Sequence, residues 1–153
     1  MTLYKRVLVA VDLNGGADEV LEKASGFLLG DAVDVTVINV VYDPVQLYDS
    51  YMGIEAYSVE PFSAPDEAQV RQQTLPIMQT LIDKVSLPNP KLLVEFGRTV
   101  NTILETADKF EADLILLGSH GRHGIGLLLG STANGVLHRA KCDVLAVRIK
   151  EPK

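Results

Sequence analysis

Residues 112–140 read ADLILLGSHGRHGIGLLLGSTANGVLHRA. The opening run, Ala112 to Leu117, is apolar at nearly every position, which is typical of a strand buried on both faces of a parallel sheet. The closing run, Ser131 to Ala140, is predicted to be a helix. Between them lies a glycine-rich connection, Gly118 to Ser131. A strand, a connection and a helix in this order are the repeating unit of an α/β fold.

The same alternation extends over the whole chain. The first strand ends at Asp12, and helical spacing begins after an Asn14-Gly15-Gly16 turn. We expect strands at 3–11, 33–41, 92–96, 112–117 and 144–149, and helices at 17–29, 65–86, 100–110 and 131–140. That order predicts a Rossmann-like open five-stranded parallel sheet with right-handed crossovers and helices on both faces. A length of 153 residues suits one domain covering residues 1–153.

The segment from Tyr42 to Ala64 has no clear period and contains four tyrosines. A connection of this length is unusual inside one domain, and it is interpreted either as a functional loop or as a mobile surface loop. In the helix that follows, Pro65 suits the first helical position. Pro76 is expected to kink that helix or to start a fresh segment.

Composition restricts the classes of partner. The formal net charge is −6, and no basic stripe of the kind that nucleic-acid binders carry is visible. No apolar stretch reaches membrane-spanning length, and the amino terminus lacks a signal-peptide pattern. We therefore expect a soluble cytoplasmic protein that binds neither nucleic acid nor membrane. The single cysteine, Cys142, excludes an internal disulfide; Lys141 beside it could lower its thiol pKa, but a small packed residue is favoured.

Asp12 and the glycine-rich connection fall at the carboxyl ends of two expected strands. Ligands of open parallel sheets bind beyond such ends, where the strand order reverses. Glycines let successive N–H groups point into one concavity, and a helix from Ser131 offers free N–H groups and the positive end of its dipole. Thr132 adds a hydroxyl and Arg122 a mobile charge. These features favour phosphate, although glycine content alone leaves a flexible loop followed by a serine N-cap equally open.

Common phosphate and nucleophile motifs do not fit this segment. Ser131 follows Gly130 and not a lysine, so the P-loop pattern is absent. The nucleophile elbow G-x-S-x-G is absent as well, because Gly118-Ser119-His120-Gly121 has the wrong spacing. With no Walker lysine and no evident base, no catalytic residue is assigned, and ATP hydrolysis is expected to be slow at most.

Two blocks of sequence resemble the universal stress protein family. One combines Gly118-Ser-His-Gly121, the run LLL, Gly130-Ser131 and VLHRAKCDVLAVR at 136–148; the other is VLVAVD, ending at Asp12. The resemblance covers essentially the full chain and implies a five-stranded, adenine-nucleotide-binding α/β fold with a regulatory or signalling role in stress response. Many members bind ATP through G-x₂-G-x₉-G-[ST], whereas others lack the motif and bind none.

The resemblance assigns parts of a nucleotide to individual positions. Asp12 matches the carboxylate on the adenosine side, Val40 matches the residue whose backbone contacts adenine, and Leu117 would pack under the nucleoside. The positions that match the family's glycine motif are expected to contact the ribose and the phosphates. The expected site consists of Ala10, Val11, Asp12, Val40, Leu117, Gly118, His120, Gly121, Arg122, Gly130, Ser131 and Thr132. The implied cofactor is ATP, ADP or AMP, with Mg²⁺ held mainly by the phosphates.

One departure from the family pattern leaves alternatives open. Eight residues, 122–129, separate Gly121 from Gly130, where the usual pattern has nine. A dimeric interaction module without nucleotide therefore stays open, as does a small hydrolase or transferase that uses His120 or His123 as acid or base. Metal held directly by these two histidines is disfavoured, because the site would need a third ligand, for which Asp12 is the candidate, and a fixed geometry.

The last strand, Val144 to Ile149, is expected at an edge of the sheet. An exposed apolar edge invites pairing with another chain. Members of the family that this chain resembles commonly dimerise through this strand. We therefore expect a homodimer.

Overall fold

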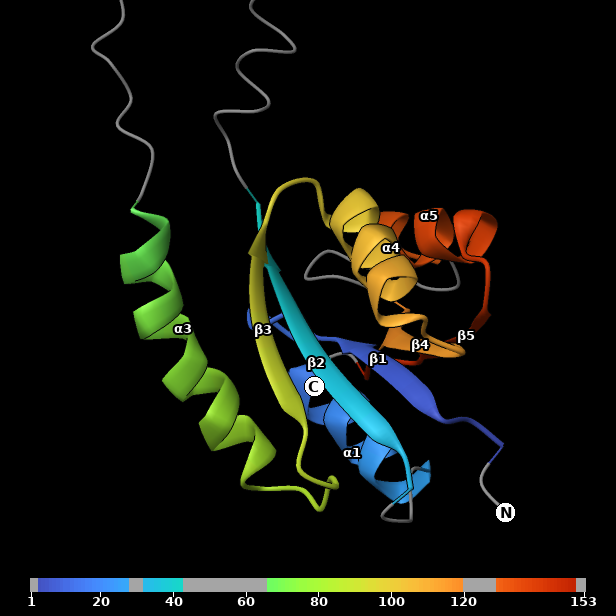
Figure 1. Ribbon diagram of the computed structural model, residues 1–153, viewed down its shortest axis with the longest axis horizontal. Helices are drawn as coiled ribbons and strands as arrows, with labels where there is room; N and C mark the ends of the chain where they lie inside the picture. The colour runs from blue at the N-terminus through green and yellow to red at the C-terminus, as the bar shows by residue number, and fades with distance from the viewer. Residues whose placement is uncertain (1–2, 28–31, 43–65, 120–128, 151–153) are drawn as a thin grey trace, which may run out of the picture.

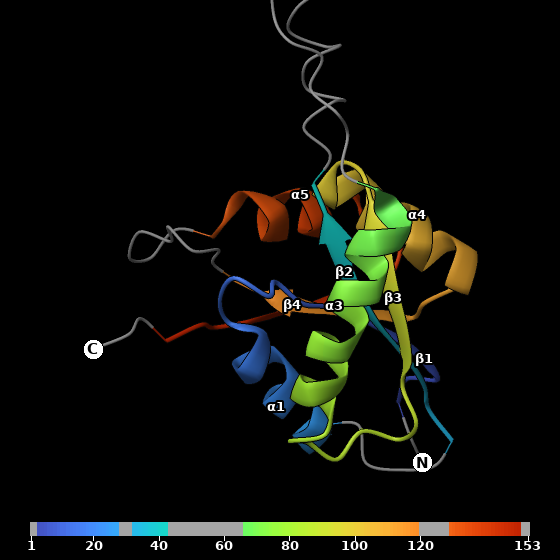
Figure 2. The ribbon, with the colours of Figure 1, turned by 90° about the vertical axis from the view of Figure 1, so that its left-hand side faces the viewer.

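The computed structural model describes residues 3–27, 32–42, 66–119 and 129–150. In that part of the chain, five parallel strands form one sheet in the order β3-β2-β1-β4-β5. The strands are β1 (Arg6–Ala10), β2 (Asp34–Val41), β3 (Lys91–Phe96), β4 (Leu114–Gly118) and β5 (Asp143–Val147); the helices are α1 (Ala17–Phe27), α3 (Glu67–Ile82), α4 (Thr99–Phe110) and α5 (Ser131–Arg139). Figures 1 and 2 show α1 and α3 on one side of the sheet and α4 and α5 on the other. The predicted fold class is confirmed.

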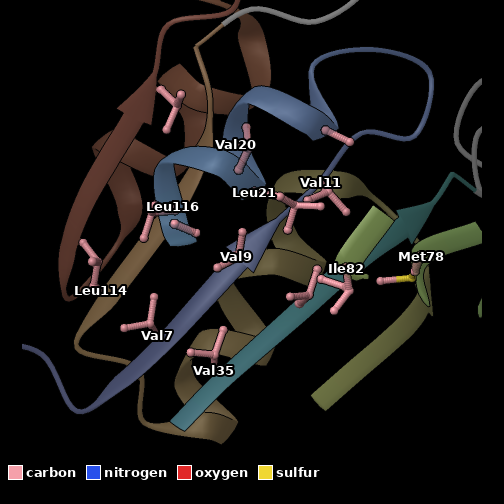
Figure 3. Packing of buried hydrophobic residues seen from close by; sticks show 14 of the residues in the cluster. Val7, Val9, Val11, Val20, Leu21, Val35, Met78, Ile82, Leu114 and Leu116 are labelled. Atoms are coloured by element: carbon pink, nitrogen blue, oxygen red, sulfur yellow. The ribbon is translucent and has the colours of Figure 1, made fainter. Parts of the chain in front are cut away.

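The sheet is buried on both faces, which explains why its strands are apolar at successive positions. Neighbouring side chains of a strand point to opposite faces. Val7 and Val9 of β1 therefore pack towards α1 and α3, with Leu21 and Met78 among their neighbours (Figure 3). Leu8, between the two valines, belongs to the second core, against α4 and α5. β1 is the central strand of the sheet, so both cores include its side chains.

The start of α3 differs from the prediction. Asp66 is its N-cap, and the Asp66 carboxylate accepts a hydrogen bond from the Ala68 N–H at 3.0 Å. The helix accordingly begins at Glu67, and the expected start at Pro65 is wrong, because a side-chain acceptor at position 66 caps the first turn. The helix also continues through Pro76, so no fresh segment starts there. Residues 43–65 lie outside the described ranges, so both interpretations of that connection stay predictions.

The two edges of the sheet differ. β5 is an edge strand, as predicted. At the opposite edge, the Arg71 side chain of α3 lies against β3: its Nε donates to the Val94 carbonyl at 3.1 Å, and its guanidinium carbon lies 4.9 Å from the Phe96 ring centroid. Gly97 N–H donates to Val41 of β2, so Val94, three residues earlier, directs its carbonyl away from β2. Arg71 therefore occupies an outward-facing acceptor of the β3 edge.

No helix in the described ranges is both long enough and apolar enough to cross a membrane.

Replacing Thr36 with valine is expected to stabilise the protein. Thr36 of β2 is buried, and its Oγ1 is the one buried side-chain nitrogen or oxygen atom within the described ranges that has no hydrogen-bond partner. An unsatisfied buried hydroxyl costs about 1–3 kcal/mol, and valine has nearly the same shape. Chemical denaturation should give a free energy of unfolding about 1 kcal/mol higher for Thr36→Val. A lower value would mean that the hydroxyl is hydrogen-bonded.

Candidate functional site

The strand order reverses between β1 and β4. From β1 the chain proceeds outward to β2 and β3, whereas β4 and β5 lie on the other side of β1. Connections that leave neighbouring strands in opposite directions open a crevice beyond the carboxyl ends of those strands. A cavity of about 560 Å³ occupies that place, and residues at the ends of β1, β2 and β4 and at the start of α5 line it.

The turn between β1 and α1 forms one wall of this cavity. One Asp12 carboxylate oxygen accepts the Asn14 N–H at 2.9 Å, and the Asp12 carbonyl accepts the Gly15 N–H at 3.2 Å. Gly16 has a positive φ of 79°, and a Cβ there would lie 2.8 Å from Ile149 Cδ1. The backbone conformation therefore favours glycine at position 16, and a Cβ there would also require the Ile149 side chain to shift.

The end of β2 forms the floor. Val11 N–H donates to the Ile38 carbonyl at 2.9 Å, which continues the β1–β2 pairing one step beyond β1. The Val11 carbonyl, in turn, accepts a hydrogen bond from the Asn39 side-chain amide at 3.0 Å. Val40 lines the cavity next to this bond.

The connection between β4 and α5 is closed at its base. Ser119 N–H donates to the Val147 carbonyl of β5 at 2.7 Å, and the Ser119 carbonyl accepts the Gly130 N–H at 2.6 Å. The two ends of the glycine-rich connection are thus hydrogen-bonded to each other and attached to β5.

Helix α5 begins at this base with its N–H groups uncapped. Gly130 is the N-cap, with φ −61° and ψ 157°, and no side chain accepts from the first turn. The first intrahelical bond runs from Asn134 N–H to the Gly130 carbonyl at 2.9 Å. The described residues supply no hydrogen-bond partner for the N–H groups of the three residues before Asn134, and the first turn carries no acidic residue.

Nine of the twelve predicted site residues line the cavity: Ala10, Val11, Asp12, Val40, Leu117, Gly118, Gly130, Ser131 and Thr132. His120, Gly121 and Arg122 lie outside the described residues, and so does His123. Asp12 is the one charged side chain in the lining as far as the structure describes it. A polyanion at this position would therefore contact backbone N–H groups and hydroxyls in the described lining. Among the described residues, no group of three or more His, Cys, Asp or Glu is placed to hold a metal ion.

Several lining residues were missed in the sequence. Thr74 from α3, Thr99 from α4 and Ile149 after β5 reach the cavity from distant parts of the chain, and no local pattern marks them. Asn39 did carry a signal, because it is an amide within the apolar run VINVV. The Asn14-Gly15-Gly16 segment was predicted as a turn, but not as part of the site.

Cys142 is expected to react slowly with alkylating reagents. Burial raises the pKa of its thiol, and the carboxylates of Asp143, Asp113 and Asp108 raise it further. Lys141, which could have lowered that pKa, is paired with Asp108 at 2.9 Å. A raised thiol pKa leaves less thiolate near neutral pH, and the rate should increase as pH rises towards that pKa. Iodoacetamide labelling of Cys142 should be slower in the native protein than in urea; an equal or faster native rate would contradict this assignment.

Comparison with known proteins places the chain in a family. The family model "Universal stress protein family" matches residues 3–148. Universal stress protein A homolog 2 of Coxiella burnetii is 39% identical over 151 residues, which cover 98% of this chain and 99% of that protein.

Solved structures share the fold. The universal stress protein UspA from Lactobacillus plantarum superposes with a TM-score of 0.66 and 26% identity, covering 95% of this chain and 98% of that one. A universal stress protein in complex with cAMP superposes with a TM-score of 0.64 and 21% identity, covering 94% of this chain and 96% of that one. The Archaeoglobus fulgidus universal stress protein in complex with dAMP superposes with a TM-score of 0.53 and 21% identity, covering 97% of this chain and 99% of that one. The chain belongs to the universal stress protein family.

Proposed function

We propose that this protein binds an adenine nucleotide, ATP in the first instance with ADP and AMP as the other candidates, and that the bound nucleotide serves a regulatory or signalling role in stress response. The observation that carries the proposal is the cavity at the strand-order reversal, which brings Asp12, Val40 and the uncapped start of α5 together. The cAMP and dAMP complexes of two proteins with this fold support the ligand class.

The phosphate end of the proposed site is the start of α5. Uncapped N–H groups and the positive end of a helix dipole attract anions, and the Ser131 and Thr132 hydroxyls add donors. Because the described lining holds no cationic side chain, we expect Mg²⁺ to accompany the phosphates and to be held mainly by them. His120, Gly121 and Arg122 are proposed to complete this end.

The nucleoside end is proposed between β1 and β2. The Asp12 carboxylate has acceptor capacity beyond its bond to Asn14, which suits a ribose hydroxyl or another donor of adenosine. Ala10, Val11 and Leu117 supply apolar surface for the nucleoside. We propose no catalytic residue, and turnover of ATP is expected to be slow at most.

The alternative of a nucleotide-free interaction module drew on the eight-residue spacing between Gly121 and Gly130. The Ser119–Gly130 hydrogen bond weakens that alternative. Because this bond joins the ends of the connection, we expect the shorter spacing to leave Gly118 and Ser131 at the cavity.

Replacement of Asp12 by asparagine tests the nucleoside end. Asparagine keeps an oxygen for the Asn14 N–H, so the turn should persist, while the charge is lost. Hydrogen bonds to charged groups contribute about 1.5–3 kcal/mol, so titration calorimetry with Mg-ATP should show an affinity roughly ten- to a hundredfold lower.

The matched control is Asp18→Asn, which makes the same change of charge at an exposed position in the first turn of α1. We expect its affinity for ATP to equal that of the wild type. If the wild type binds neither ATP, ADP nor AMP, the proposed function is wrong.

We further propose that two copies pair through the β5 edge. Among the described residues no strand pairs with the outer side of β5, which includes half-buried Val144 and Leu145. Light scattering at micromolar concentration should give the mass of a dimer, and a monomer mass would count against this pairing.

A further inference from the structure

Asn39 differs from its neighbours in β2. The strand reads DVTVINVV, and Asn39 is 8% exposed at its carboxyl end. Burying an amide is unfavourable unless its polar atoms are hydrogen-bonded. The Asn39 amide donates to the carbonyl of Val11, on the neighbouring chain segment, at 3.0 Å. An apolar side chain would suit the strand better, so the bond to Val11 needs a reason.

The register shows what that bond replaces. The Val11 N–H donates to the Ile38 carbonyl, so Ile38 directs its polar groups towards β1. Val40 lies two residues further and directs its N–H and carbonyl to the same side, because alternate residues of a parallel strand do so. The Val41 carbonyl, bonded to Gly97 on the β3 side, agrees with this alternation. The next ladder bond would therefore join the Val40 N–H to the Val11 carbonyl.

That ladder bond is not made. Among the hydrogen bonds of the described residues, the Val11 carbonyl accepts from the Asn39 side chain, and none joins the Val40 N–H or carbonyl to the β1 side. Val40 thus presents one donor and one acceptor side by side into the cavity that it lines.

We propose that Asn39 is a positioning residue of the nucleotide site. Its amide occupies the Val11 carbonyl, ends the β1–β2 ladder one bond early, and so leaves the Val40 N–H and carbonyl for the hydrogen-bonding edge of a base. The inference rests on the proposed function for its ligand, but the absence of a hydrogen bond between the Val40 N–H and the Val11 carbonyl is a property of the protein alone. Asn39 itself acts through Val11 and Val40.

Amide hydrogen exchange, followed by NMR, tests without any ligand whether the Val40 N–H is free of the Val11 carbonyl. In the unliganded wild type, the Val40 amide should exchange at least tenfold faster than the Ile38 amide. In Asn39→Ala the Val11 carbonyl is released, and the Val40 amide should become protected. Asn39→Leu, which keeps the side-chain volume and removes the donor, should give the same result if the alanine variant folds poorly. Equal protection of Val40 and Ile38 in the wild type would overturn the proposal.

Calorimetry with ATP and with inorganic tripolyphosphate tests the ligand half. Loss of the base contacts should lower the ATP affinity of Asn39→Leu about tenfold or more, and leave tripolyphosphate affinity unchanged. Thr36→Val is the matched control, because it also removes a buried polar group from β2, at the other end of the strand from the cavity; its affinities should equal those of the wild type.

The outcomes separate the two proposals. If the wild type binds ATP and Asn39→Leu binds it equally well, the role of Asn39 is wrong and the proposed function stands. If the wild type binds neither ATP nor tripolyphosphate, the proposed function and the ligand half both fall. In either case, the exchange rates of the Val40 amide show whether Asn39 prevents the hydrogen bond between the Val40 N–H and the Val11 carbonyl.

Discussion

Ser131→Asp should abolish ATP binding and leave the fold at least as stable as before. Ser131 is the first residue of α5 and lines the cavity, and the first turn of this helix has neither an acidic residue nor a side-chain cap. An acidic group there complements the helix dipole, which contributes about 0.3–1 kcal/mol to stability. The same charge would stand where we place the phosphates. Like charges about 4 Å apart near a protein surface repel by roughly 4 kcal/mol, which corresponds to about a thousandfold loss of affinity.

The opposite signs of the two effects make this substitution informative. Thermal unfolding should give an unchanged or higher Tm, while calorimetry with Mg-ATP should detect no binding. Asn134→Asp is the control: it adds one negative charge to the same helix at an exposed position that does not line the cavity. We expect that variant to retain most of the wild-type affinity. Wild-type affinity in Ser131→Asp would show that the phosphates do not bind at the start of α5.

Gly16→Ala should be the most destabilising single substitution proposed for this chain. Position 16 has φ 79°, which costs an L-residue roughly 1–2 kcal/mol. The added Cβ would also lie 2.8 Å from Ile149 Cδ1 and 3.0 Å from its Cγ1. Overpacking of this kind costs about 1–3 kcal/mol. The sum of about 2–5 kcal/mol should lower Tm by roughly 4–20 °C, since each kcal/mol shifts Tm by about 2–4 °C in a domain of this size.

Gly15→Ala provides the control, because no atom lies within 4 Å of a Cβ built at Gly15. It should leave Tm nearly unchanged. The double variant Gly16→Ala with Ile149→Ala separates the two contributions: it removes the collision and retains the backbone strain. Part of the lost stability should return relative to the sum of the single variants. A purely additive double variant would assign the whole effect to the backbone.

The fold was predictable because burial on both faces of a parallel sheet leaves long apolar runs, as at 7–11 and 114–117. Asp12 and Gly118 were found by their position at strand ends, where topology alone directs ligands. Thr74 and Ile149 were not found, since their approach to the cavity depends on the packing of α3 and of the chain after β5. The start of α3 was misplaced because proline at 65 and a capping aspartate at 66 are both typical of helix starts, and the Asp66 hydrogen bond decided between them.

Helix α3 covers one edge of the sheet, and this has a consequence for assembly. Arg71 occupies the outward carbonyl of Val94 at the β3 edge, whereas β5 has no such cover among the described residues. A sheet with two open edges can add copies indefinitely and grow into a filament. A sheet with one open edge can add a single copy, and a two-fold contact through that edge consumes it. If two copies pair through β5 as we propose, the side chain that packs α3 against the sheet also disfavours further pairing at the β3 edge.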